Sequence, residues 1–133
     1  PTAPAALNGL SVGYGVATVF ALLPALTPGE YDTIILDPPA FTKSGKTVKN
    51  AQRGYKEINY RAMKALPRGG YLATCSCSHF MTDALFRKML QSAAADAQVE
   101  LRLVEARAQA PDHPVLWNVP ETDYLKFYIF QVV

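Results

Sequence analysis

The hydrophobic positions along the chain predict strands and helices in alternation. Residues 31–37 (YDTIILD) form a nearly continuous apolar and β-branched run, which is typical of a strand buried on both faces of a parallel sheet. Between Thr47 and Leu66 the apolar residues recur every three or four positions, as on one face of a helix. Pro67 and the glycines after it end this helix. The first half of the chain therefore predicts a strand followed by a helix.

The second half of the chain continues this alternation and finishes with two strands. Residues 70–77 (GYLATCSC) are a second candidate for a buried strand, and Thr82 can cap a helix that runs through Asp96. Residues 99–109 alternate like a strand, and residues 123–133 are rich in aromatic and β-branched side chains. Strand, helix, strand, helix and two further strands make an α/β pattern.

Three chemistry-bearing side chains lie where the two predicted buried strands end. Asp37 ends the first strand, and Cys75 and Cys77 lie at the end of the second. Because ligands of open parallel sheets bind beyond the carboxyl ends of the strands, we expect these side chains to face one crevice. The Asp-Pro-Pro that starts at Asp37 either simply ends its strand or forms a rigid turn that accepts hydrogen bonds from an exocyclic amino group.

The two cysteines are separated by one residue, which is too close for an ordinary disulfide. A structural zinc site needs about four ligands, and His79 and His113 are the only histidines beside the pair, so we expect no metal site. Buried cysteines are common and inert, whereas a nucleophilic thiolate needs a polar, preferably electropositive crevice. Cys77 is nearer the strand end and is the better candidate nucleophile, and Cys75 is expected to lie deeper.

Positive charge is concentrated in one segment of the chain. The 133 residues fit one domain, and with 50% hydrophobic residues the chain should fold around a core. A net charge of +2 does not by itself indicate nucleic-acid binding, but residues 43–68 hold 8 of the 13 basic residues with Glu57 as the only acid. These basic residues are Lys43, Lys46, Lys49, Arg53, Lys56, Arg61, Lys64 and Arg68.

The amino-terminal stretch shows no targeting segment. The apolar run GVATVFALLPAL is far shorter than a membrane span and is interrupted by Pro24. We therefore expect no membrane partner and a cytoplasmic protein with reduced thiols. The chain has no initiator Met and enters in the middle of a pattern, so we expect it to be a piece of a longer protein.

Four segments carry a resemblance to a known family: DPPAF (37–41), RGYKEIN (53–59), SCSHFM (76–81) and the stretch from DHPV through PE to YLK (112–126). In this order and spacing they resemble the S-adenosylmethionine-dependent rRNA cytosine-C5 methyltransferases. They are most similar to the bacterial large-subunit rRNA group that carries an N-terminal PUA domain. The Asp-Pro-Pro alone is shared with amino-methylating enzymes, whereas RGYKEIN joined to SCS is far more specific.

The resemblance implies covalent catalysis on a flipped-out cytosine in RNA. Cys77, at the position of the family's motif VI cysteine, would attack C6, so that C5 takes the methyl group from S-adenosylmethionine and loss of the C5 proton releases the thiolate. Asp37 would hold the pyrimidine edge near N3 and N4. Pro38 and Pro39 would shape the pocket, and Phe41 would pack on the base or the cofactor. Asp37 and Pro38 would also belong to the cofactor site, which is only partial in this chain.

The other candidate residues have competing interpretations. In RGYKEIN, Glu57 forms an i,i+4 pair with Arg61 and the basic stripe is a solvated helix face, or else Arg53 and Lys56 neutralise RNA phosphates or hold the loop after Asp37. Three further residues have structural expectations. We expect Cys75 to pack in the core and Trp117 to have no role beyond packing. We expect His113 to order a loop near the site, with action as a base as the alternative.

The chain also departs from the family. The Gly-rich cofactor turn and the acidic residue that holds the ribose are absent, and Thr18 stands where relatives usually carry Asp. The resemblance implies a Rossmann-like class I sheet ordered 3-2-1-4-5-7-6. Of this sheet the chain would supply strands 4-5-7-6, with flanking helices and an antiparallel last strand, while strands 1 and 2 are missing. We expect a partial catalytic domain, with residues 1–29 a residual segment and residues 30–133 the core half, that is inactive when isolated.

The missing strand next to residues 31–37 predicts an exposed edge. We expect either a second copy of the chain to pair there or residues 1–29 to repack over the gap. Two other functions compete with cytosine methylation. The first is an amino-group methyltransferase for adenine or guanine that uses the Asp-Pro-Pro, and the second is a degenerate domain that only binds RNA.

Overall fold

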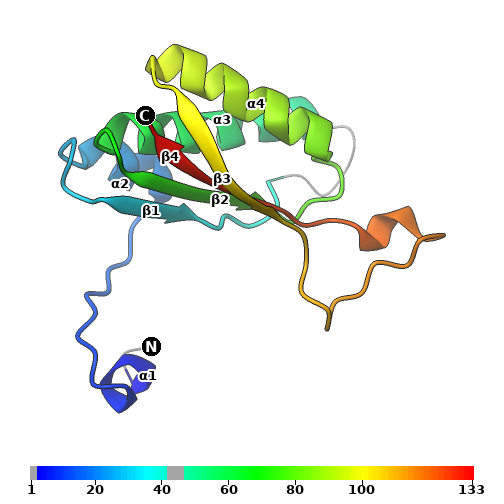
Figure 1. Ribbon diagram of the computed structural model, residues 1–133, viewed down its shortest axis with the longest axis horizontal. Helices are drawn as coiled ribbons and strands as arrows, with labels where there is room; N and C mark the ends of the chain where they lie inside the picture. The colour runs from blue at the N-terminus through cyan, green and yellow to red at the C-terminus, as the bar shows by residue number, and fades with distance from the viewer. Residues whose placement is uncertain (1–2, 42–46) are drawn as a thin grey trace.

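Four strands form one mixed sheet in the order β1-β2-β4-β3 (Figure 1). The computed structural model describes residues 3–41 and 47–133. β1 and β2 are parallel, and β4 runs antiparallel to both of its neighbours, β2 and β3. The strands are β1 (Thr33–Leu36), β2 (Tyr71–Ser76), β3 (Leu101–Arg107) and β4 (Lys126–Val132). The expected order of the four strands and the antiparallel direction of the last one are therefore confirmed.

Two long helices, α3 (Val48–Ala65) and α4 (Asp83–Ala97), pack against each other on one face of this sheet (Figure 1). The periodic apolar face of α3 enters the core, and Tyr55 is fully buried there. α4 begins after Thr82, whose hydroxyl accepts a hydrogen bond from the main-chain N–H of Leu85, as expected of an N-cap. The predicted helices are confirmed to within one residue at each end.

β2 is an interior strand, between β1 and β4, and its residues from Leu72 through Ser76 are all buried. β1 differs from its prediction. A strand buried on both faces was expected, but Ile35 is 70% exposed and Thr33 is also exposed. The reason is that Thr33 and Ile35 alternate with Ile34 and Leu36 and point to the face of the sheet that α3 and α4 do not cover (Figure 1). β1 is also an edge strand, because within residues 3–41 and 47–133 no second strand pairs with its outer side.

The amino-terminal part contains two helices that the pattern analysis did not predict. α1 (Ala3–Leu7) and the residues up to Thr18 are almost wholly exposed and extend away from the sheet (Figure 1). α2 (Val19–Ala25) packs against α3 and buries Leu23. Residues 3–18 therefore do not cover the open edge of β1. Lys43 and Lys46 of the basic segment lie outside the described residues.

A short 3-10 helix, η2 (Pro120–Thr122), precedes β4. In the described part of the chain, none of the helices is long and apolar enough to cross a membrane.

Candidate functional site at the carboxyl ends of β1 and β2

Asp37 follows the last residue of β1 and begins a loop that borders an open cleft of about 460 Å³. Four of the residues predicted for the substrate and cofactor sites therefore lie around one cleft. Neither cysteine is among the residues that line it. The lining residues are Thr18, Val19, Phe20, Ile35, Leu36, Asp37, Pro38, Pro39, Phe41 and Ile58.

Cys75 is buried and points at the end of β1. Its Sγ lies 3.2 Å from Oδ1 of Asp37 and 3.5 Å from the main-chain oxygen of Leu36, so the thiol can donate a hydrogen bond to either oxygen. Burial, followed by the hydrogen bond to Asp37 and the charge of that carboxylate, raises the pKa of Cys75 to about 12. Cys75 is therefore a protonated thiol at neutral pH and is not a nucleophile. Cys75 is buried in the core, as expected, and its contact with Asp37 was not predicted from the sequence.

Cys77 lies just beyond the end of β2 and is exposed. The two cysteines thus differ in depth in the order that strand alternation predicts. In the pairing of β1 with β2, Leu36 lies opposite Thr74. The next residue of each strand is then Asp37 and Cys75, so Asp37 also lies near the end of the strand that presents Cys77. Of the two thiols, Cys77 is the one that a reagent or substrate can reach, and its catalytic role stays a prediction.

The hydroxyl of Tyr55, on α3, connects the loop after Asp37 to the end of β2. Ser76 Oγ donates a hydrogen bond to this hydroxyl at 3.0 Å, and the backbone of Phe41 also bonds to it. The rings of Phe41 and Tyr55 meet edge to face, with centroids 4.6 Å apart. Burial raises the pKa of Tyr55, so the phenol stays neutral. The sequence placed Tyr55 in the core, but no local pattern predicted that its hydroxyl connects the Asp37 loop to the residue before Cys77.

Lys126 is a second residue whose position the sequence did not predict. It is the first residue of β4 and is only 8% exposed. Its ammonium donates hydrogen bonds to the main-chain oxygens of Ser78 at 2.5 Å and Tyr124 at 2.7 Å. The sequence offers one sign of this position, which is a lysine at the start of an otherwise apolar strand. That pattern is as typical of a lysine in solvent at a strand end as of a buried one.

Arg53 and Lys56 lie on a different surface from the Asp37 cleft. They border a shallow depression between α3 and α4 together with Glu57, Tyr60 and Asp96. Lys56 forms an ion pair with Asp96 at 2.6 Å, which ties the two helices together. The predicted pair of Glu57 and Arg61 is confirmed at 2.8 Å. The charge of Lys56 therefore already has an acidic partner, and the proposed contact of both residues with RNA stays a prediction.

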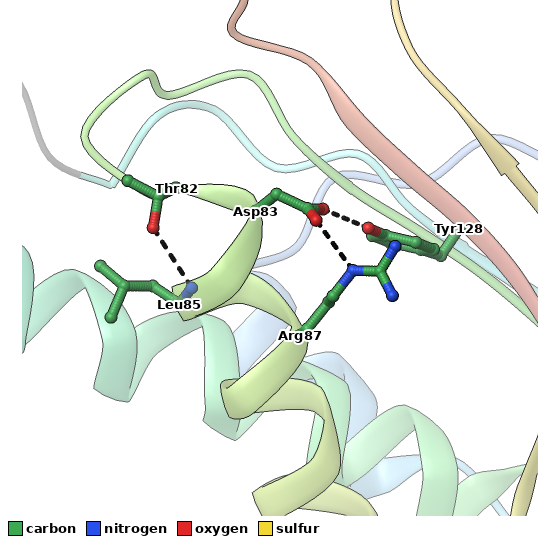
Figure 2. A network of polar contacts seen from close by, with 5 residues as sticks. All are labelled: Thr82, Asp83, Leu85, Arg87 and Tyr128. Carbon is green, nitrogen blue, oxygen red and sulfur yellow. Dashed lines mark hydrogen bonds and ion pairs between the residues drawn. The ribbon is translucent and has the colours of Figure 1, made fainter.

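A polar network at the start of α4 is drawn in Figure 2. Asp83 accepts hydrogen bonds from the Tyr128 hydroxyl and from Nε of Arg87, and the guanidinium of Arg87 lies over the Tyr128 ring, 5.2 Å from its centroid. Burial raises the pKa of Asp83, but these hydrogen bonds outweigh it and the net pKa is lowered. The carboxylate therefore carries its charge and is engaged with Tyr128 and Arg87.

The segment between β3 and β4 is braced internally by Gln109. Its side-chain amide donates to the main-chain oxygens of His113 and Thr122 and accepts from the main-chain N–H groups of Tyr124 and Leu125. Ordering of this loop thus depends on Gln109, whereas the His113 ring contacts only the neighbouring Asp112 among the interactions found, at 3.2 Å.

Trp117 shows that one packing expectation was wrong. Its side chain is 95% exposed, because the segment that carries it extends away from the sheet (Figure 1). Within the described ranges, no group of three or more His, Cys, Asp or Glu side chains is arranged to hold a metal ion.

The sequence relatives of the chain are rRNA methyltransferases. Ribosomal RNA large subunit methyltransferase I of Erwinia tasmaniensis is 45% identical over 132 residues, which cover 96% of this chain and 33% of that protein. The protein of the same name from Pseudoalteromonas atlantica is 47% identical over 104 residues, covering 78% of this chain and 26% of that protein. The chain is homologous to part of these methyltransferases. No protein-family model matches it.

Solved structures agree on the fold. The crystal structure of a methyltransferase complexed with SAH superposes with a TM-score of 0.74 at 21% identity and covers 94% of this chain and 33% of that one. A Streptococcus mutans protein assigned to the SAM-dependent methyltransferases gives a TM-score of 0.73 at 22% identity. The four-stranded sheet therefore matches part of a methyltransferase structure. The chain spans about a third of the length of its curated relatives, and the expected relationship to SAM-dependent rRNA methyltransferases is confirmed at this level.

Proposed function

We propose that this chain is the base-handling part of an S-adenosylmethionine-dependent methyltransferase that forms 5-methylcytosine in large-subunit rRNA. One observation carries the proposal: an exposed thiol, Cys77, and a carboxylate, Asp37, stand at the carboxyl ends of two adjacent parallel strands. The homology to ribosomal RNA large subunit methyltransferase I supports the choice of rRNA as substrate.

In the proposed reaction the Cys77 thiolate forms a bond from Sγ to C6 of a cytosine. The electron pair of the C5–C6 double bond then makes C5 nucleophilic, and C5 would take the methyl group as the methyl–sulfur bond of the donor breaks and leaves a neutral thioether. A base or water molecule would then take the C5 proton, so that the double bond re-forms and the thiolate is expelled. Asp37 holds the N3 and N4 edge of the base, and the bonded thiol of Cys75 keeps one carboxylate oxygen of Asp37 in a fixed direction.

The cleft beside Asp37 fits part of the methyl donor. Apart from Asp37 and Thr18, its lining is made of apolar side chains, which suits a flat ring or a thioether chain. Asp37 and Pro38 would border the bound cofactor on one side, while Pro39 and Phe41 would shape the base pocket. S-adenosylmethionine, when bound, supplies an electrophilic methyl group.

Residues 1–133 would be part of a cytoplasmic catalytic domain, with residues 30–133 as its core half and the Gly-rich cofactor turn supplied from outside this sequence. The isolated chain would then be inactive. The open edge of β1, with Ile35 70% exposed, supports pairing of a second copy through residues 31–37.

The decisive experiment uses 5-fluorocytosine RNA and the gene product that carries this chain. Because fluorine at C5 cannot leave as a proton does, the covalent adduct should accumulate and be visible as a shifted band in a denaturing gel. Cys77→Ala should abolish the adduct. Cys75→Ala keeps the nucleophile and should still form the adduct, but more slowly, because Asp37 loses the thiol that bonds its carboxylate. Full methylation by Cys77→Ala would overturn the proposal.

The same experiment separates the competing functions. An amino-group methyltransferase built on the Asp-Pro-Pro would methylate adenine or guanine without an adduct and without Cys77. A domain that only binds RNA would show salt-dependent binding that weakens in Arg53→Gln, with neither an adduct nor methyl transfer. Arg53 is exposed at the helix surface, which makes it the better probe of phosphate contact than the ion-paired Lys56.

A further inference from the structure

Lys126 is a charged side chain in an unusual setting. Its ammonium is buried, and the two hydrogen-bond acceptors found for it are neutral main-chain oxygens, those of Ser78 and Tyr124. Within the described ranges no carboxylate lies within ion-pair distance of it. Buried lysines are normally paired with an acid, because an isolated ammonium loses the solvation it has in water.

Lys126 lies beside the turn that contains Cys77. In the antiparallel ladder of β2 and β4, Lys126 is the direct partner of Ser76. Its Nζ then reaches the main-chain oxygen of Ser78. Along the chain Cys77 lies between these two residues, so the main chain of Lys126 holds one side of the turn that presents the thiol and its ammonium holds the other.

The acids around Lys126 do not neutralise it. Asp83 on α4 is engaged by the Tyr128 hydroxyl and by Arg87, as Figure 2 shows, and Asp123 is exposed. Burial lowers the pKa of Lys126, and the charge of a Cys77 thiolate is the largest influence that raises it again, ahead of Asp123 and Asp83. The other ionisable groups on elements packed around this region are the exposed Glu121 of η2, Tyr55 on α3, His79, Arg107 on β3 and Asp37.

We infer that Lys126 is a positioning residue whose buried ammonium holds the Cys77 loop and stabilises the thiolate of Cys77. The inference rests on the proposed function in that it gives the nucleophile its supporting charge. A thiolate is favoured beside a cation, and the effect is strong where the cation is screened from water. Conversely, the negative charge that forms at Sγ would supply the counter-ion that Lys126 otherwise lacks.

The test measures how fast Cys77 reacts with iodoacetamide as a function of pH. This reaction reports thiolate directly and needs neither RNA nor cofactor. Both cysteines lie in the tryptic peptide 69–87, and fragment masses tell them apart, so the buried Cys75 is an internal control for unfolding. The variants are Lys126→Met, which keeps the length and loses the charge, Lys126→Gln, which keeps a donor, and Lys126→Arg, which keeps the charge. Lys88→Met, at an exposed lysine of α4, is the matched control.

The expected result is a selective loss of Cys77 reactivity. At pH 7 the alkylation rate should fall about tenfold in Lys126→Met and Lys126→Gln, equivalent to a displacement of the rate profile by about one pH unit. Lys126→Arg should restore much of the rate, and Lys88→Met should leave it unchanged. Unchanged rates in both neutral variants would overturn the inference.

A faster reaction of Cys75 and Cys77 together would also overturn it, because that result assigns Lys126 a purely structural role. The outcome is independent of the RNA adduct experiment. A protein that forms no adduct with 5-fluorocytosine RNA but shows the Lys126-dependent rate of Cys77 would disprove the proposed function and leave this inference standing.

Discussion

Residues 47–133 and residues 3–36 are held in place to very different degrees. Among the buried residues in the part of the chain that the structure describes, only Leu23 and Leu36 come from the amino-terminal stretch, and all others lie at Ala51 or beyond. The later residues pack two helices on one face of the sheet, while α1 and the residues that follow it extend into solvent (Figure 1). Most of the core that positions the carboxyl end of β2, and Cys77 with it, therefore comes from residues 47–133, while β1 adds the parallel pairing along one side of β2. The cleft at Asp37, by contrast, depends on both regions.

The largest test of this comparison removes a ring from each region. Phe86 is fully buried, with Tyr55 and Tyr128 as ring neighbours at centroid distances of about 6 Å. Phe86→Ala should lower the free energy of unfolding by about 3–5 kcal/mol, measured by urea denaturation. The control is Phe20→Ala in α2, where the half-exposed ring should cost no more than about 1 kcal/mol. Equal losses in the two variants would contradict the comparison.

A smaller effect is expected from a buried hydrogen bond between α3 and β2. Thr74 donates to the side-chain oxygen of Asn59 at 2.7 Å, and both residues are fully buried. Thr74→Val should leave this oxygen without its donor and cost about 1–3 kcal/mol of unfolding free energy. Thr33→Val in the exposed part of β1 is the same chemical change and should cost less than about 0.5 kcal/mol. A neutral Thr74→Val would show that the interface relaxes around the lost donor.

The two helix caps offer a still smaller contrast. Thr82 caps α4 through its side chain, with Leu85 as donor at 3.2 Å, whereas Thr18 at the start of α2 makes no side-chain cap. Thr82→Ala should therefore cost about 1 kcal/mol of unfolding free energy. Thr18→Ala should leave the urea midpoint essentially unchanged. A comparable loss at both caps would indicate that α2 is held more firmly than its exposure suggests.

The smallest expected effect is a dependence of stability on acid pH. Because the folded-state pKa of Asp83 lies below its ordinary value of 3.8, the unfolded chain takes up its proton first as the pH falls. The stabilisation is therefore present above about pH 4 and is lost as the pH falls through the folded pKa. Asp83→Asn should flatten the acid limb of a plot of urea midpoint against pH, and Tyr128→Phe should flatten it in part. An unaltered limb in Asp83→Asn would exclude this carboxylate as a source of acid sensitivity.

Local patterns were sufficient for the secondary structure of residues 47–133. The helices at Val48–Ala65 and Asp83–Ala97 follow from apolar spacing and from their end signals, and these are properties of neighbouring residues. The same reasoning failed for β1, because an apolar run shows that a strand can be buried but not whether a neighbour is present to bury it. It failed for Trp117 as well, since an aromatic residue carries no local sign of facing solvent.

The sequence by itself determined the α/β class, the order of the elements and the two thiols and one carboxylate at the strand ends. What it could not determine are contacts between residues distant along the chain. Cys75 meets Asp37 across 38 positions, and Lys126 reaches Ser78 across 48. Such contacts follow from strand register and from burial, which exist only in the folded sheet. The tertiary structure therefore decided that one thiol is protonated and bonded to Asp37, and that the other stands exposed in a turn whose next residue, Ser78, is held by a buried ammonium.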